Sequence, residues 1–196
     1  MSAKGSAFER ELCTRLSLWW TKGERQDVFW RTSNSGGRAT VRGRKGKGTY
    51  GQYGDVAAID PVGEPLLKIF TIEAKRGYKG SSLMDLIDCP MNAAKPEYLK
   101  WIDKVNHDSA SANSYSWLLV VRRNKRQAIV FLNAFVASLL GFPIDHHLTN
   151  KSAVIKAEIN GELISVFITQ LENFFDFVRP ETIMKMSETA KGNDHE

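Results

Sequence analysis

The sequence predicts a single α/β domain whose mixed central sheet is flanked by helices. Segments of helical periodicity alternate with segments of strand character along the chain. Two continuous apolar runs, at 117–121 and 128–132, are typical of strands buried on both faces. At 196 residues and 42% hydrophobic content, the chain is long enough for one well-packed core.

The first predicted elements are a helix and three strands. Residues 7–20 should form an amphipathic helix, because apolar side chains recur there at helical spacing (Phe8, Leu12, Leu16 and Trp19). A short strand should begin at 28–30. Residues 55–60 and 69–75 read as two further strands. The turn-forming residues at 61–65 predict that these two strands form a hairpin.

The second half should add a short helical turn at 82–88 and a longer helix at about 96–109 before the two apolar strands. Further elements follow these strands. They are a helix at 134–140, a hairpin with strands at 155–159 and 163–168 around Asn160-Gly161, and a helix at 171–178. We therefore expect one domain over residues 1–186, with its core at about 5–133, peripheral elements at 134–186 and a disordered tail at 187–196.

Composition limits the compartment and the class of partner. The N-terminus lacks the apolar segment of a signal peptide, and no apolar run approaches a membrane span, so we expect a cytoplasmic protein without a membrane partner. The two cysteines lack the spacing of a thiolate metal site. The formal charge is +5, but the first 53 residues carry +7, which favours a polyanionic partner.

Glycine and basic residues dominate residues 32–53, which bury little apolar surface and predict a loop. Its cations would neutralise DNA phosphates, while its glycines would let the backbone approach a duplex. A merely solvated surface loop is the alternative. The candidate DNA-binding residues in and around this loop are Arg31, Arg38, Arg42, Arg44, Lys45, Lys47 and, after the second strand, Arg76.

The residues with catalytic chemistry are Asp55 and, further along, Glu73-Ala74-Lys75. Side chains two apart on a strand share a face, so Glu73 and Lys75 should project together while Ala74 points into the core. The hairpin would bring Asp55 beside them. Alternatively, Glu73 and Lys75 are ordinary exposed partners on an amphipathic strand.

Two carboxylates and an ammonium on one side of a sheet are suited to phosphodiester hydrolysis. Carboxylate oxygens are hard ligands for Mg²⁺, for which Mn²⁺ can substitute, and the Ala74 carbonyl could add a ligand. The metal would activate a water, and Lys75 would position that water or offset charge developing on phosphorus.

The runs GSAFERELCTRL, RTSNSGG, GDVAAID and FTIEAKRG resemble the archaeal Holliday-junction resolvase branch of the PD-(D/E)XK nucleases. The resemblance covers about residues 5–76 well and those up to 132 loosely. It implies a restriction-endonuclease-like core, DNA as substrate and a homodimer. It also implies that Asp55, Glu73 and Lys75 are catalytic, that Glu9 is an accessory metal-side carboxylate, and that Ser35 contacts the DNA backbone.

This chain departs from the family pattern in three places. Gly54 stands where the motif has proline, the basic loop is longer than a minimal resolvase needs, and residues after 133 have no recognised counterpart. Two other functions therefore stay open beside a structure-selective endonuclease. One is a sequence-specific restriction-like or nicking endonuclease, and the other is a non-catalytic DNA-binding protein with a nuclease fold.

Overall fold

The computed structural model describes residues 3–32, 53–77, 80–88, 94–144, 151–159 and 161–190. The N-terminal elements are α1 (Ala3–Trp20), β1 (Phe29–Arg31), β2 (Val56–Ala58), a 3-10 helix (Pro61–Gly63), α3 (Glu64–Ile69) and β3 (Phe70–Arg76). They are followed by a second 3-10 helix (Met84–Leu86), α4 (Glu97–Ala112), β4 (Ser116–Arg122), β5 (Ile129–Asn133), α5 (Ala134–Leu139), β6 (Ser152–Ile159), β7 (Glu162–Gln170), α6 (Leu171–Phe177) and α7 (Pro180–Thr189).

A mixed sheet forms the centre of the fold, in the order β3-β4-β5-β7-β6 among the described strands. β3 and β4 are parallel and are joined through α4, while the remaining neighbours are antiparallel. The predicted α/β class with a mixed, helix-flanked sheet is therefore confirmed. β3 lies at one edge of this sheet, and its outer side faces the short antiparallel pair β1-β2.

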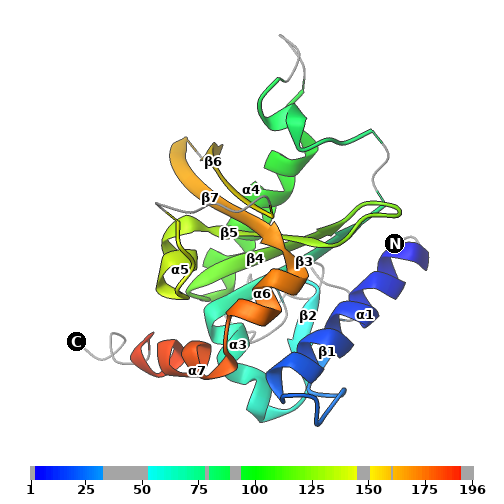
Figure 1. Ribbon diagram of the computed structural model, residues 1–196, viewed down its shortest axis with the longest axis vertical. Coiled ribbons are helices and arrows are strands. Elements are labelled where there is room, and N and C mark those ends of the chain that lie inside the picture. The colour runs from blue at the N-terminus through cyan, green and yellow to red at the C-terminus, as the bar shows by residue number, and fades with distance from the viewer. Residues whose placement is uncertain are drawn as a thin grey trace.

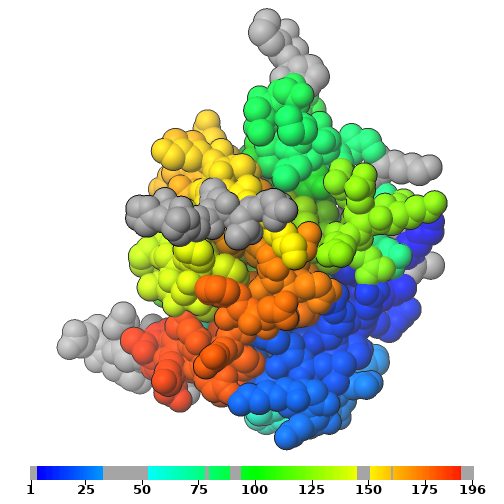
Figure 2. All heavy atoms as spheres, viewed as in Figure 1, coloured from blue at the N-terminus to red at the C-terminus, as the bar shows by residue number. Residues whose placement is uncertain are grey.

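The two faces of the sheet pack against different helices (Figure 1). One face carries α1, α3, α6 and α7, and Figure 2 shows α1, α6 and α7 covering it from outside. The other face is covered by α4, whose Tyr98, Trp101, Ile102 and Val105 are buried against the sheet. Since side chains alternate along a strand, β3 presents Ile72 and Ala74 to the first face and Glu73 to the α4 face.

The predicted hairpin between residues 55–60 and 69–75 is wrong. β2 pairs with β1 instead, and residues 61–69 form the 3-10 helix and α3 before β3 begins at Phe70. Proline in a first turn is compatible with a helix, and the Asp60 side chain caps the 3-10 helix by accepting from the Val62 amide. Burial of Leu66 and Ile69 then stabilises α3, so these residues start helices rather than close a turn.

Several other expectations are confirmed by the fold. The helix expected at 7–20 is α1, which starts at Ala3, and the helices expected at 96–109, 134–140 and 171–178 are α4, α5 and α6. The hairpin expected around Asn160-Gly161 pairs β6 with β7. α7 extends to Thr189, into the segment 187–196 predicted as a tail, whereas 191–196 and the loop residues 33–52 lie outside the described part of the chain. None of the helices described is long and apolar enough to cross a bilayer.

Gly54 marks the point where the chain comes closest to β3. Its φ is +77°, and a Cβ added there would lie 2.5 Å from the main-chain oxygen of Ile72. L-residues rarely adopt this conformation, and the contact is with backbone that cannot move aside without disturbing the strand. Only glycine therefore allows residue 55 to reach the edge of β3.

Gly54→Ala should lower the free energy of unfolding by about 3 kcal/mol or more, because backbone strain and a steric clash combine. Gly23→Ala is the matched control, since Gly23 also has a positive φ, +94°, but nothing lies within 4 Å of its added Cβ. That control should lose only about 1 kcal/mol. Urea denaturation of both variants measures the difference. Equal losses would contradict the close approach at residue 54.

Candidate active site

Asp55 is attached to the edge of β3 at two points. Its amide donates to the Ile72 carbonyl at 2.7 Å, and its side-chain Oδ2 accepts a hydrogen bond from the Ala74 amide at 2.8 Å. The Asp55 carbonyl in turn accepts from the amide of Thr32, which follows β1. Asp55 is buried, with 7% of its surface exposed. The carboxylate is thus fixed beside β3 without a hairpin.

Glu73 and Lys75 project from the α4 face of β3, as their spacing predicted. The Lys75 ammonium donates to Glu73 Oε1. Glu73 is almost completely buried, at 2% exposed, so the alternative of two exposed partners on an amphipathic strand does not hold. Ala74 lies between them with its amide on Asp55, so the two carboxylates and the ammonium come together at one end of β3.

Glu9 lies on α1, against the opposite face of β3, and is buried at 6% exposed. Its Oε2 is 3.1 Å from Nε of Arg31, the last residue of β1. After burial and the charge of Glu73, the negative charge of Glu9 also raises the pKa of Asp55. Arg31, predicted to contact DNA, is therefore an ion-pair partner of Glu9 in this structure.

Lys104 of α4 also contacts Glu73, and the sequence did not point to it. Its ammonium lies 3.0 Å from Glu73 Oε2 and 2.7 Å from Oδ2 of Asp108, one helical turn further on. Burial lowers the pKa of Lys104, but the charges of Glu73 and Asp108 outweigh this effect and raise it overall. No local pattern marks Lys104, because only the crossover from β3 through α4 to β4 brings that helix over Glu73.

Burial and neighbouring charge raise the pKa of Asp55 to about 6. Burial is the larger cause and the charge of Glu73 comes next, with Glu9 adding a smaller contribution. The Ala74 hydrogen bond and Lys75 oppose the shift. Burial, followed by the charges of Glu9 and Asp55, also raises the pKa of the Cys13 thiol to about 12. The site therefore concentrates negative charge in a poorly solvated region.

Oxygen donors at this end of β3 are chemically suited to a hard divalent cation. A cation would offset both the burial and the repulsion from Glu73 that raise the pKa of Asp55. No three His, Cys, Asp or Glu side chains converge as a ready-made metal site within the described ranges. The ligands would thus be Asp55 and Glu73, with further positions for the Ala74 carbonyl, water and phosphate, a set that Mg²⁺ accepts.

The predicted DNA-binding residues are only partly described. Arg76 ends β3, beside Arg122 of β4 in the strand register. Arg122 pairs with Glu11 of α1 and lies over the Phe8 ring at 5.2 Å, where the β4-β5 turn extends toward the start of α1 (Figure 1). The other candidates, Ser35, Arg38, Arg42, Arg44, Lys45 and Lys47, lie outside the described residues.

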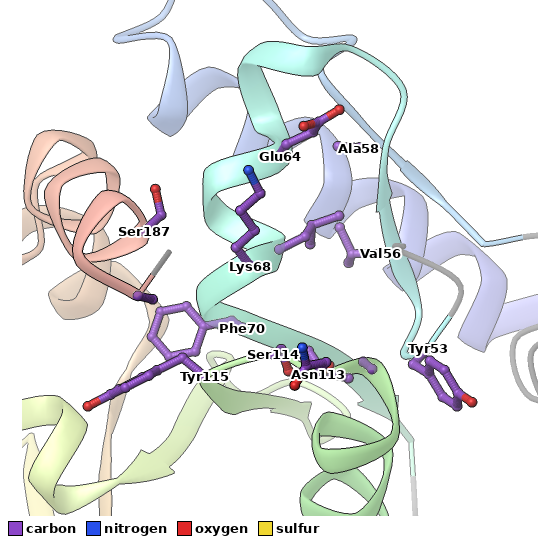
Figure 3. Close-up of a pocket in the computed structure, with 14 residues that line it drawn as sticks. Tyr53, Val56, Ala58, Glu64, Lys68, Phe70, Asn113, Ser114, Tyr115 and Ser187 are labelled. Atoms are coloured by element: carbon purple, nitrogen blue, oxygen red, sulfur yellow. Dashed lines mark hydrogen bonds between the residues drawn. The ribbon is translucent and has the colours of Figure 1, made fainter. Parts of the chain in front are cut away.

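A groove of about 570 Å³ adjoins the candidate site without including it. Figure 3 shows its walls, with Tyr53 on one side, Tyr115 on another, and Lys68 and Glu64 of α3 above Phe70. Thr71 lines the groove and lies two residues before Glu73, on the same face of β3. The carboxylates and Lys75 are not among its lining residues.

The chain belongs to the family described as "Phage putative PDDEXK endonuclease", whose model matches residues 1–185. This match covers the peripheral elements after residue 133, which had no recognised counterpart. It supports the PD-(D/E)XK superfamily, and thus a nuclease. No curated protein and no solved structure matches the chain.

Asp55→Asn should stabilise the metal-free protein at pH 7.5. Because the folded-state pKa of Asp55 is about 6, above its ordinary 3.8, the folded protein binds the proton more tightly. The stability that the protonated carboxyl of Asp55 contributes is therefore lost as the pH rises from about 4 to 6, and the charged form then costs about 3 kcal/mol. Asparagine has no such charge and can still accept from Ala74.

Thermal unfolding in EDTA at pH 4.5, 6 and 7.5 tests this expectation. The gain in Tm should be largest at pH 7.5 and should shrink toward pH 4.5. Asp60→Asn is the control with the opposite sign, because the Val62 amide and Arg25 lower the pKa of Asp60. It should lose stability at neutral pH. If the Tm of Asp55→Asn at pH 7.5 were equal to or lower than that of wild type, the charged Asp55 carboxylate would not destabilise the folded protein.

Proposed function

We propose that this protein is a divalent-metal-dependent DNA endonuclease that hydrolyses phosphodiester bonds with Asp55, Glu73 and Lys75. The observation that carries the proposal is the Ala74 amide bound to Asp55 Oδ2, between a buried Glu73 and its partner Lys75. A structural ion pair needs no second carboxylate beside it. The raised pKa of Asp55 adds support, since strongly perturbed carboxyls cluster at functional sites.

Each residue has a distinct role in this proposal. Asp55 and Glu73, with the Ala74 carbonyl, would hold Mg²⁺ or Mn²⁺, and Glu9 would contribute accessory negative charge from α1. A bound divalent ion supplies Lewis acidity and lowers the pKa of a coordinated water. Lys75, with 17% of its side chain exposed, would orient the attacking water and offset charge developing on the phosphate.

Different parts of the chain favour different functions, of which we consider three. The resolvase resemblance of residues 5–76 favours branched DNA and a homodimer that makes paired cuts. The elements after residue 133 favour instead a restriction-like or nicking enzyme that recognises a sequence. A non-catalytic DNA-binding protein is the third reading. It is disfavoured because buried carboxylates beside a phosphate would repel DNA if no metal ion acted there.

Cleavage assays distinguish these readings. Wild-type protein is incubated with a labelled four-way junction, a linear duplex and a supercoiled plasmid, each with Mg²⁺, Mn²⁺ or EDTA. Metal-dependent cutting should fall by at least about 100-fold in Lys75→Ala and be abolished in Asp55→Asn and Glu73→Gln. Lys156→Ala is the control, because Lys156 is exposed on β6, at the opposite edge of the sheet.

DNA binding is measured alongside by fluorescence anisotropy in EDTA. Both carboxylate variants should bind as tightly as wild type or more tightly, since each removes a negative charge near the phosphate. Symmetric junction-selective cuts would favour the resolvase-like reading, and cutting at one sequence the restriction-like reading. Binding without cutting of any substrate would count against an enzyme, and loss of binding in the carboxylate variants would indicate a structural role.

A further inference from the structure

Glu73 is held by two ammonium groups from different elements. Lys75 donates to Oε1 from the same strand, and Lys104 lies 3.0 Å from Oε2, reaching it from α4. Both oxygens of a carboxylate with 3% of its side chain exposed are thus occupied by cations. A metal ion that binds Glu73 must share it with these lysines or displace one of them.

Lys104 is the more easily displaced of the two. Half of its side chain is exposed, against 17% for Lys75. Lys104 also has a second partner, since Asp108 Oδ2 is 2.7 Å from the same ammonium. An ammonium released from Glu73 would therefore keep a paired position one turn along α4. Lys104 thus lies between the buried Glu73 carboxylate and solvent.

The charge of Lys104 affects how strongly the carboxylates beside β3 attract a divalent ion. The buried acids Glu9, Asp55 and Glu73 are compensated by the bases Arg31, Lys75 and Lys104. Asp108 shares Lys104, so the local charge stays slightly negative even with Lys104 in place, but the Lys104 ammonium weakens the attraction of Glu73 for a divalent ion. Without Lys104, the carboxylates would carry a net negative charge that attracts a divalent ion more strongly.

We propose that Lys104 is a positioning residue of this active site, which occupies Glu73 Oε2 in the metal-free protein and competes there with the divalent metal ion. This inference rests on the proposed function. Its consequence is that the metal ion binds weakly on its own. A DNA phosphate offers the displaced ammonium a new partner, so metal and DNA should bind cooperatively.

The first test is the affinity of the protein for Mn²⁺ without DNA, measured from the electron paramagnetic resonance signal of free Mn²⁺. Lys104→Gln should bind Mn²⁺ more tightly than wild type, on the order of tenfold at low salt, because one competing charge has been removed. Salt should narrow this difference, since Lys104 is half exposed. A lysine that only supported the fold would not tighten metal binding when lost.

Two variants serve as controls. Lys100→Gln removes a similarly exposed lysine from the same helix, one whose partner is Glu97 rather than Glu73. Lys104→Arg keeps the positive charge. Both should stay within about twofold of wild type, because neither alters the charge at Glu73. Thermal unfolding of each variant establishes that the fold is intact.

The second test is the dependence of DNA cleavage on Mn²⁺ concentration. The half-maximal concentration should fall in Lys104→Gln by a factor similar to the change in affinity. Unchanged or weaker Mn²⁺ binding by Lys104→Gln, while wild type cuts DNA with Mn²⁺, would overturn the role of Lys104 alone. The expected shift in affinity without any cleavage would support Lys104 and count against the nuclease. Absence of Mn²⁺ binding by both proteins would overturn the role of Lys104, and if neither protein then cut any DNA, the nuclease proposal would fall as well.

Discussion

The attachment of residue 55 to the edge of β3 is the constraint on which the candidate site depends. β3 is an edge strand, so its outer side offers main-chain groups that another segment can use. Asp55 uses two of them, the Ile72 carbonyl through its own amide and the Ala74 amide through its side chain. Because these groups flank Glu73, the same two bonds that close the sheet edge bring the second carboxylate to the first.

The carboxylates of this site are buried, and ion pairs with basic side chains offset the cost of burying their charge. Glu9 has a guanidinium from β1, and Glu73 has ammonium groups from β3 and α4. A buried carboxylate without a partner strongly destabilises a fold, so these ion pairs make the burial of both acids possible. Each partner comes from a different element, and the site therefore assembles only when the tertiary fold is complete.

Local patterns in the sequence predicted the strands at 117–121 and 128–132 and the helix that became α1, because continuous apolar runs indicate strands buried on both faces and helical spacing indicates one buried helix face. They misassigned the turn at 61–65, because proline is favoured in the first turn of a helix as well as in turns. The shared face of Glu73 and Lys75 followed from strand alternation. The contacts of Lys104 with Glu73 and of Arg31 with Glu9 could not be predicted, since each joins elements that meet only through sheet topology.

Gly54 has a consequence for how such proteins are detected and designed. The PD-(D/E)XK motif that this segment resembles begins with proline, but proline fixes φ near −65°, whereas residue 54 of this chain has a φ of +77°. A search pattern that requires the proline would miss chains with this backbone geometry, although their acidic residues are intact. A consensus design that restored the proline would likewise separate Asp55 from the strand that holds its two partners.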